Sequence, residues 1–474
     1  MKKFTLRLPV FAATIWLTLS YAQAQPTLLA VGTLTQSRAG ANADLSGLTN
    51  TLENGAPANM LGGLGSGLAY ASGNTFLAIP DRGPNAVPYD ATVDNTVSYI
   101  NRFHTITMDL KPNTSASGLP FTLVPTLRST TLLWSLTPLV YGSGTGLGVG
   151  SGVPKVNNFL QHFFTGRSDN FDPAKNSGDP NDARLDTESI RVSNDGFNVF
   201  ISDEYGPYVY LFNRLTGVRL RSYKLPDAFY VSNLRPVGAD EITANTSGRT
   251  ANKGMEGLAI TPDGRTLVGI MQNALIQDAA LGGAAANLLR IVTIDVLTGQ
   301  THQYAYLLTT GSGVSEICAI NNHEFLVDER DGKGLEGGDG STSNNAKVKQ
   351  LFKIDLAGAV DISNMDGAAA ATHHIAKTLF LDIVSVLTAN GFLANHIPSK
   401  IEGVAFGPDV MKGTTKLHTL WISNDNDFVL STLDTPPIPN PNQFLVFGVA
   451  DADLNGSMFV PEFHESSAPD IDPY

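Results

Sequence analysis

The sequence predicts an all-β fold of the β-propeller class, in which small antiparallel sheets are arranged around an axis. Gly (46) and Pro (26) are frequent among the 474 residues, which indicates many turns and therefore many short strands. A short pattern recurs five times, and each copy is typical of a strand, a turn and a second strand. Helical periodicity is weak, with residues 376–387 as the best candidate, so an α/β fold lacks the alternating helices that it needs.

The repeated pattern is an apolar strand, a turn rich in Gly, Asn and Asp, and a second apolar strand. Such turns between two apolar runs are typical of β-hairpins. The five copies start at Ser66, Glu188, Glu256, Glu316 and Glu402. The first interval is about twice the others, so a degenerate unit is expected near residues 123–136. We therefore predict six blades of roughly 65 residues, with seven possible, because one small sheet cannot bury both faces whereas a closed ring can.

The two ends of the repeat region are expected to meet. An apolar strand is predicted at residues 27–34, before the first repeat, and another at 443–449, after the last. Pairing of these two strands would close the ring. Residues 25–474 are accordingly interpreted as a single propeller domain.

The first 24 residues have the pattern of a signal peptide. Lys2, Lys3 and Arg7 form a basic start, an apolar run follows, and small residues at Ala22 and Ala24 place cleavage before residue 25. The apolar run is shorter than the roughly 20 residues that cross a bilayer. No cysteine lies near the cleavage point, so a lipid anchor is not expected. The sequence predicts a periplasmic or secreted protein.

The net charge of the chain limits the kinds of molecule that it can bind. The formal charge is −13, and it becomes −16 without residues 1–24, which carry three basic and no acidic residues. Such a chain repels nucleic acid and anionic membrane surfaces, and no later stretch resembles a membrane helix. We expect a monomer that binds a small molecule, without nucleic acid and without membrane insertion. The only cysteine, Cys318, lies in an apolar strand pattern and is expected in the core.

Acidic residues recur at two equivalent points of the repeats. The start of a hairpin's first strand and the end of its second strand lie at the same edge of the sheet. If the first strand is innermost, both sets converge on one mouth of the central channel. Carboxylates crowded in this way raise one another's pKa unless a cation neutralises them, and Ca²⁺ is the hard cation that best suits oxygen ligands outside the cytoplasm. The predicted metal ligands are Glu188, Glu256, Glu316, Glu402 and Asp425.

The same glutamates could instead have a structural role. In this alternative, each one anchors neighbouring blades by accepting hydrogen bonds from backbone amides. The set at the ends of the second strands is less regular, and this makes it the better candidate for catalysis. Arg offers planar, bidentate donors for phosphate or carboxylate, although an arginine beside an acid is also typical of a solvated ion pair. The predicted catalytic residues are Asp81, Arg82, Asp203, Glu204, Glu329 and Arg330.

A separate signal lies in residues 451–462. Asp451, Asp453, Asn455, Gly456 and Glu462 match the spacing of a twelve-residue Ca²⁺ loop, with short oxygen donors first, Gly at the sharp turn and a carboxylate at the end. A β-like run precedes the segment and no helix follows it, so a plain turn stabilised by Asx side chains is the alternative. The predicted metal ligands of this segment are Asp451, Asp453, Asn455 and Glu462.

An ordered series of motifs resembles the phytase-like family, described as "esterase-like activity of phytase". The resemblance covers about residues 60–450, and the motifs that carry it are 77–83 (LAIPDRG), 186–190 (DTESI), 202–207 (SDEYGP), 254–259 (GMEGLA), 328–331 (DERD) and 400–403 (KIEG). It implies a β-propeller, a secreted or periplasmic location, phosphoric ester hydrolysis, and Ca²⁺ by similarity to propeller phytases. The chain departs from a strong phytate binder in having few lysines near the motifs and Ser66 in place of the first acid.

Three functions are therefore compared. The first is a metal-dependent phosphoric ester hydrolase, in which Ca²⁺ at the propeller mouth activates a water and Arg82 and Arg330 stabilise the transferred group. The second is a carboxylic-ester or lactone hydrolase on the same scaffold. The third is a non-catalytic propeller that binds a ligand.

Overall fold

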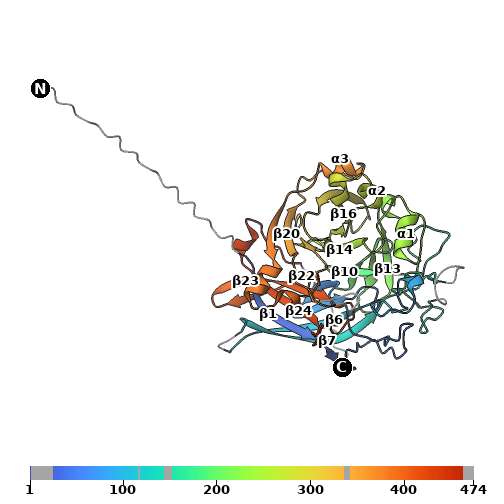
Figure 1. Ribbon diagram of the computed structural model, residues 1–474, viewed down its shortest axis with the longest axis horizontal. Helices are drawn as coiled ribbons and strands as arrows, with labels where there is room; N and C mark the ends of the chain where they lie inside the picture. Colours follow the sequence, from blue (N-terminus) through green and yellow to red (C-terminus); the bar gives the residue numbers. More distant parts are fainter. Residues whose placement is uncertain (2–24, 116–117, 143–151, 336–341, 463–474) are drawn as a thin grey trace.

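The computed structural model describes residues 1, 25–115, 118–142, 152–335 and 342–462. The predicted signal peptide lies outside the described residues. The fold is an all-β propeller, as predicted, and the described residues contain five four-stranded antiparallel sheets, here called blades 1 to 5. Figure 1 shows the blades arranged around a common centre, with β10, β14 and β22 nearest to it.

Four blades are each built from consecutive strands. Blade 1 contains β4 (Gly67–Ser72), β5 (Thr75–Ile79), β6 (Arg102–Pro112) and β7 (Phe121–Leu132). Blade 2 contains β10 (Thr187–Val192), β11 (Asn198–Asp203), β12 (Tyr208–Asn213) and β13 (Arg219–Lys224). Blade 3 contains β14 (Met255–Ile260), β15 (Thr266–Met271), β16 (Leu288–Asp295) and β17 (Thr301–Leu307). Blade 4 contains β18 (Gly313–Ala319), β19 (Glu324–Arg330), β20 (Lys349–Asp355) and β21 (Lys377–Asp382).

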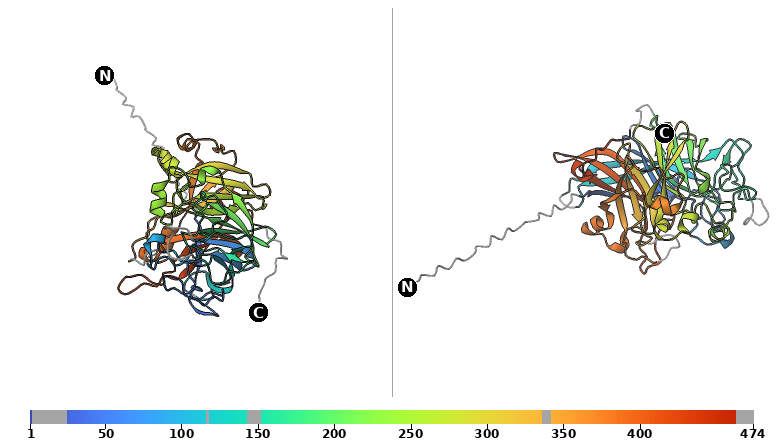
Figure 2. Two further views of the ribbon diagram at one scale, coloured as in Figure 1. Left: turned by 90° about the vertical axis from the view of Figure 1, so that its right-hand side faces the viewer. Right: turned by 90° about the horizontal axis from the view of Figure 1, so that it is seen from above.

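Blade 5 combines both ends of the described chain. It contains β22 (Lys400–Lys412), β23 (Thr415–Asp425) and β24 (Asn442–Val449), with β1 (Thr27–Leu34) as its outermost strand. β1 pairs with β24 in antiparallel register from Thr27 opposite Gly448 to Leu34 opposite Asn442. Figures 1 and 2 show the blue first strand beside the red last strands in different views.

The first strands of the five blades line the axis. β4, β10, β14, β18 and β22 are neighbours in this cyclic order, with β22 next to β4. They approach closely: a Cβ added at Gly257 would lie 2.7 Å from the backbone nitrogen of Ile317 in the next blade. Side chains of the strands fill the spaces between blades, where clusters of fully buried Leu, Ile, Val and Phe form the core.

Two expectations differ from the structure. The additional blade expected near residues 123–136 is instead the long fourth strand of blade 1, followed by β8 (Trp134–Ser135), which forms a two-stranded sheet with β9 (His162–Phe163). The long interval thus holds an insertion between blades 1 and 2. Residues 376–387 begin as strand β21 and only then form the short helix α4 (Ile383–Ala389), because Asp382 caps the helix by accepting from the Ser385 amide.

The helices are short connections outside the ring. They are α1 (Gly238–Ala244), α2 (Ile276–Ala279), α3 (Gly367–Ala371) and α4. In the part of the chain that the structure describes, no helix has the length and apolar character needed to cross a membrane.

Candidate functional site

Strand pairing defines a first ring of side chains at one mouth of the channel. The pairing between the first and second strands lets us align the five blades. One residue of each inner strand serves as the reference position: Leu68, Ile190, Leu258, Ile317 and Val404. Two positions earlier in each strand stand Ser66, Glu188, Glu256, Ser315 and Glu402. Three predicted metal ligands therefore occupy equivalent positions. The equivalent residue of blade 4 is Ser315 and not Glu316, which is one position further along.

The second strands supply a second ring. The partners of the five reference residues are Ala78, Ile201, Gly269, Val327 and Ile422. Three positions later stand Asp81, Glu204, Gln272, Arg330 and Asp425. These five residues follow equivalent strands at equivalent positions, and all of them line the same cavity.

The two rings enclose a cavity of about 260 Å³, here called the cup. Its walls contain every member of both rings except Ser66, together with Arg82, Asn252, Lys253, Ser312, Gly313, Val314 and Lys400. No aromatic side chain is among these lining residues, and Val314 is their only large apolar one. Eight of the predicted site residues thus meet in one polar cavity: Asp81, Arg82, Glu188, Glu204, Glu256, Arg330, Glu402 and Asp425.

Some acids of the cup have cationic partners. Arg82 Nη1 lies 3.0 Å from Asp186 Oδ2. Arg330 forms an ion pair with Glu402 and donates from Nε to Ser315 Oγ at 2.6 Å. Lys400 Nζ lies 2.8 Å from Asp425 Oδ2. The pairs of Arg330 and Lys400 neutralise the side of the cup that blades 4 and 5 form, whereas Arg82 of blade 1 pairs with an acid just before blade 2.

Three further carboxylates remain without such a partner. Within the described residues, Glu188, Glu204 and Glu256 of blades 2 and 3 form no ion pair, although each is at least 91 % buried. Glu204 accepts from the Gly254 amide at 2.8 Å and shares a hydrogen bond with Glu256, whose Oε2 has no partner. A buried carboxylate without a cation is costly, so this half of the cup is suited to a positively charged ligand.

The pKa values of the three glutamates in this half are raised, as expected where negative charges are crowded and buried. Burial raises the pKa of Glu204 to about 7, and the nearby charge of Asp186 adds to the effect. Burial also raises the pKa of Glu188 and of Glu256 well above the usual range, with the neighbouring glutamates as the next cause. Without a cation, several of these groups would hold protons at neutral pH.

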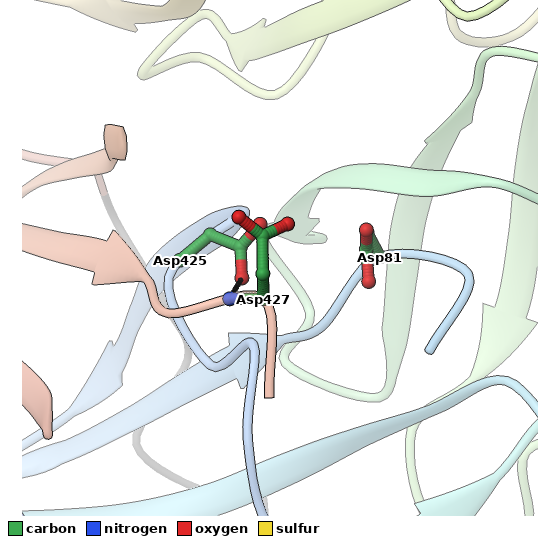
Figure 3. Close-up of side chains that lie close together, drawn as sticks. All are labelled: Asp81, Asp425 and Asp427. Carbon is green, nitrogen blue, oxygen red and sulfur yellow. Dashed lines mark hydrogen bonds between the residues drawn. The ribbon is translucent and has the colours of Figure 1, made fainter. Parts of the chain in front are cut away.

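Two sets of three carboxylates are close enough to share an ion. One oxygen from each of Asp186, Glu188 and Glu204 lies within 4.8 Å of the others, and the same holds for Asp81, Asp425 and Asp427. Figure 3 shows the second set, with Asp425 and Asp427 side by side and Asp81 facing them from another segment. Purely oxygen-based donors of this kind favour a hard cation such as Ca²⁺ or Mg²⁺.

Two predicted catalytic residues lie outside the cup. Asp203 accepts from the backbone amides of Asp186, Tyr205 and Gly206, and burial raises its pKa to about 6. Glu329 accepts from Thr310 and pairs with Lys377 of β21, the outermost strand of its blade. Each precedes a ring residue by one position, and successive side chains of a strand point to opposite faces, so both turn away from the mouth.

Glu316 also differs from its predicted role as a metal ligand. It is fully buried on the axis, where it accepts from Ser189 Oγ and the Leu258 amide and pairs with Arg191 at 3.0 Å. The alternative interpretation from the sequence, a glutamate that anchors neighbouring blades through backbone amides, describes Glu316. Arg191 and Glu316 together fill the channel beneath the cup.

The predicted calcium loop is not formed as a cluster of ligands. Residues Asp451–Leu454 form a short 3₁₀ helix, in which Asp453 accepts from the Ala450 amide at 2.7 Å. Asp451 pairs with His418 at 3.0 Å, and Asn455 adopts a left-handed conformation at the helix end. Glu462 lies near Arg191, whose charge it helps to stabilise. Among the described residues, this segment contributes no set of three neighbouring carboxylates.

Several residues of the site were not predicted. Asp186 precedes Glu188 by two positions and Lys400 precedes Glu402 by two, so strand alternation alone places each pair on one face. That signal was available in the sequence. Asn252 and Asp427 come from turns with positive φ values of 55° and 49°, and no periodicity predicts where such side chains point. Lys253 follows Asn252 in the same turn.

A curated relative, an uncharacterized secreted protein of Arthroderma benhamiae, is 33 % identical over 177 residues, which cover 31 % of this chain and 34 % of that protein. The match therefore spans about a third of that relative's length.

Solved structures resemble the chain only distantly. A periplasmic gluconolactonase of Pseudomonas aeruginosa is 13 % identical with a TM-score of 0.31, covering 90 % of this chain and 99 % of that one. A putative 6-phosphogluconolactonase of Bacteroides uniformis is 12 % identical with a TM-score of 0.31, covering 80 % and 88 %. Similarity at this level says nothing about activity.

The family comparison covers most of the chain. The model of the phytase-like family, described as esterase-like activity of phytase, matches residues 59–428. This range includes all of the rings that form the cup, from Ser66 to Asp425. The chain belongs to the phytase-like family.

Proposed function

We propose that the protein is an exported, metal-dependent phosphoric ester hydrolase whose active site is the cup. One observation carries the proposal: three buried carboxylates without cationic partners, Glu188, Glu204 and Glu256, share a polar cavity with Arg82 and Arg330. A cation on the first group and a phosphate near the two arginines would compensate each other's charge. Family membership supports a hydrolase.

Calcium fits the donors of blades 2 and 3. Asp186, Glu188 and Glu204 would hold the ion, and the partnerless Oε2 of Glu256 is a further oxygen in the same half of the cup. When bound, Ca²⁺ would neutralise phosphate oxygens and lower the pKa of a water that attacks phosphorus. An exported protein meets calcium at the concentrations that such carboxylate sites need.

The arginines would bind and orient the phosphate. Arg82 is held by Asp186 and also donates to Asn252, so its guanidinium is fixed at the rim while its Nε has no partner. Arg330 is fixed by Glu402 and by Ser315 Oγ. A guanidinium held in place in this way stabilises the charge that develops on a transferred phosphoryl group without reorganising. Glu204 and Glu256, joined by a hydrogen bond, would hold a proton beside the reacting group.

The export part of the proposal rests on the N-terminal sequence pattern. It agrees with the description of the relative in Arthroderma benhamiae as a secreted protein. Expression of the full chain, followed by N-terminal sequencing of the released protein, tests it. We expect the released chain to begin at Gln25.

A parallel assay tests the activity. The purified protein is given an aryl phosphate, phytate, an aryl acetate and a lactone, each with Ca²⁺ and with excess EGTA. We expect phosphate release with Ca²⁺ and its loss with EGTA. Turnover of the acetate or the lactone alone would replace the proposal with the carboxylic-ester or lactone alternative, and no turnover of any substrate would favour a ligand-binding propeller.

Variants then connect the activity with the cup. Glu188→Gln and Arg330→Lys should each lower kcat/KM at least tenfold, since both groups face the cavity. Glu324→Gln is the matched control, because Glu324 lies at the opposite end of β19 from Arg330 and does not line the cup. Equal losses in all three variants would contradict the assignment of the cup as the active site.

A further inference from the structure

The proposed hydrolase gives no role to a second set of carboxylates, two of which line the cup. Asp81 of blade 1 and Asp425 and Asp427 of blade 5 are 93 % or more buried, and one oxygen from each lies within 4.8 Å of the others. Asp425 Oδ1 accepts from the Asp427 amide at 2.7 Å, and Asp427 has a φ of 49°, so the turn after β23 holds the two side chains together (Figure 3).

A lysine reaches this set from the neighbouring strand. Lys400 is the first residue of β22, where it pairs with Asp425 across the hairpin. Its Nζ lies 2.8 Å from Asp425 Oδ2 and also bonds to Asp427 Oδ1. An ammonium is a compact point charge, in contrast to the wide fork of a guanidinium. The charge of Lys400 therefore lies between two of the three carboxylates, where a bound cation would lie.

The first set of carboxylates differs in this respect. Its basic neighbour, Arg82, contacts Asp186 through the backbone amide and Nη1. In the described part of the chain, Glu188 and Glu204 have no ion pair, and the adjacent Glu256 keeps a buried oxygen without a partner. In the first set, Arg82 thus pairs with Asp186 alone, whereas in the second set the single ammonium of Lys400 contacts both Asp425 and Asp427.

We propose that the Lys400 ammonium takes the place of a second divalent ion in the set Asp81, Asp425 and Asp427, so that the cup binds one divalent cation and not two. This inference rests on the proposed function for the presence of the first ion. Ca²⁺ needs oxygens at about 2.3–2.6 Å, a space that the ammonium already occupies, and the two like charges would repel each other strongly in a buried site. A chelator would then remove the ion of the first set and leave the Lys400 ammonium of the second set in place.

Ion stoichiometry tests the proposal without any assay of activity. Wild type, Lys400→Met, Lys400→Arg and Lys253→Met are dialysed to equilibrium against buffered Ca²⁺, and bound calcium per chain is measured by atomic emission. Lys253 is the matched control, since it lines the cup but has no acidic partner among the described residues. We expect one ion in wild type, Lys400→Arg and Lys253→Met, and two in Lys400→Met.

A second pair of variants keeps the result interpretable. Lys400→Met/Asp427→Asn should return to one ion, because the second site loses a ligand. Lys400→Gln serves if Lys400→Met folds poorly, and added Ca²⁺ should raise its Tm more steeply than that of wild type, since two ions then bind the folded state. Two ions in wild type, or a Lys400→Gln chain that stays at one ion and gains no extra stability from Ca²⁺, would overturn the proposal.

The two proposals fail in different ways. If wild type binds no calcium, the proposed metal site is wrong, but a gain of one ion on replacing Lys400 would still support its role as a tethered cation. If wild type binds one ion and the Lys400 variants also bind one, the hydrolase proposal stands and the inference about Lys400 is wrong.

Discussion

Arg191 and Glu316 form an ion pair on the propeller axis, with 3.0 Å between Nη2 and Oε2 and both side chains at most 2 % exposed. The pair contacts every inner strand. Arg191 donates to the carbonyl oxygens of four of them, at Leu68, Ile190, Ile317 and Val404, and Glu316 accepts from the Leu258 amide of the fifth. The cup is therefore closed from below by a charged pair that joins all five blades.

Breaking this pair should destabilise the whole ring. We expect Arg191→Met and Glu316→Gln each to lower the free energy of unfolding by about 3–5 kcal/mol, because each leaves a buried charge without its partner. Chemical denaturation measures the loss. The double variant Arg191→Met/Glu316→Gln should lose less than the sum of the two single variants, since it leaves no buried charge.

An exposed ion pair provides the control for this comparison. Lys111 and Asp109 are 3.0 Å apart, with side chains 71 % and 48 % exposed. Lys111→Ala should change the free energy of unfolding by less than about 1 kcal/mol. A similar loss at Lys111 and at Arg191 would contradict a special role for the axial pair.

Metal affinity should depend on the glutamates of blades 2 and 3. We expect Glu188→Gln and Glu204→Gln to weaken Ca²⁺ binding at least tenfold, about 1.4 kcal/mol, because each removes a charged oxygen donor from the first set. Isothermal titration calorimetry measures the affinity. Glu329→Gln is the comparison variant outside the cup, and an equal loss of affinity there would argue against the set of Asp186, Glu188 and Glu204 as the site.

The stability of the metal-free protein should fall as pH rises. Burial raises the pKa of Asp81 and that of Glu204 to about 7, so the folded state keeps protons that the unfolded chain releases near its usual carboxyl pKa of about 4. The folded state thus binds more protons between these values, and stability is lost as pH rises from about 4 to about 7.

Thermal unfolding in EGTA at about pH 5 and about pH 7.5 measures this effect, with a higher Tm expected at the lower pH. Added Ca²⁺ should stabilise the protein more at the higher pH, because the ion binds the deprotonated carboxylates. A metal-free protein that is more stable at the higher pH would contradict the raised pKa values.

The segment 451–462 should be structural. Asp453→Asn should leave calcium affinity unchanged and lower the free energy of unfolding by about 0.5–2 kcal/mol, since its carboxylate accepts from the Ala450 amide at the start of a helix. Titration with Ca²⁺ and denaturation of the same variant measure both effects. A loss of one bound ion would restore the interpretation as a calcium loop.

The fold could be predicted because the same hairpin pattern repeats along the chain. Each copy is recognised by two short apolar strands with a turn between them, such as Asp195-Gly196 or Asp263-Gly264. The blade count could not be predicted from spacing, because an insertion between β7 and β10 has the length of an extra blade. The repeat alone was enough to predict that Glu188, Glu256 and Glu402 lie at the same mouth of the channel.

Glu316 shows the limit of that reasoning. Its string, Glu-Ile-Cys-Ala-Ile, matches the other repeats by residue type, but the strand pairing shifts it by one position, and one position turns a side chain to the other face. The same limit applies to Asp203 and Glu329, which stand next to the ring residues Glu204 and Arg330 in the sequence but lie outside the cup. Only strand register distinguishes adjacent acids, and register is a property of the folded sheets.

The pairing of β1 with β24 also affects how the molecule is made. β1 is the first described strand to leave the ribosome and β24 is the last, so the fifth sheet stays incomplete until synthesis is nearly finished. During that time, two strand edges are open to other chains, and aggregation competes with folding. Expression at low temperature, or with a chaperone that covers such edges, should therefore raise the yield of soluble protein more than changes at the cup.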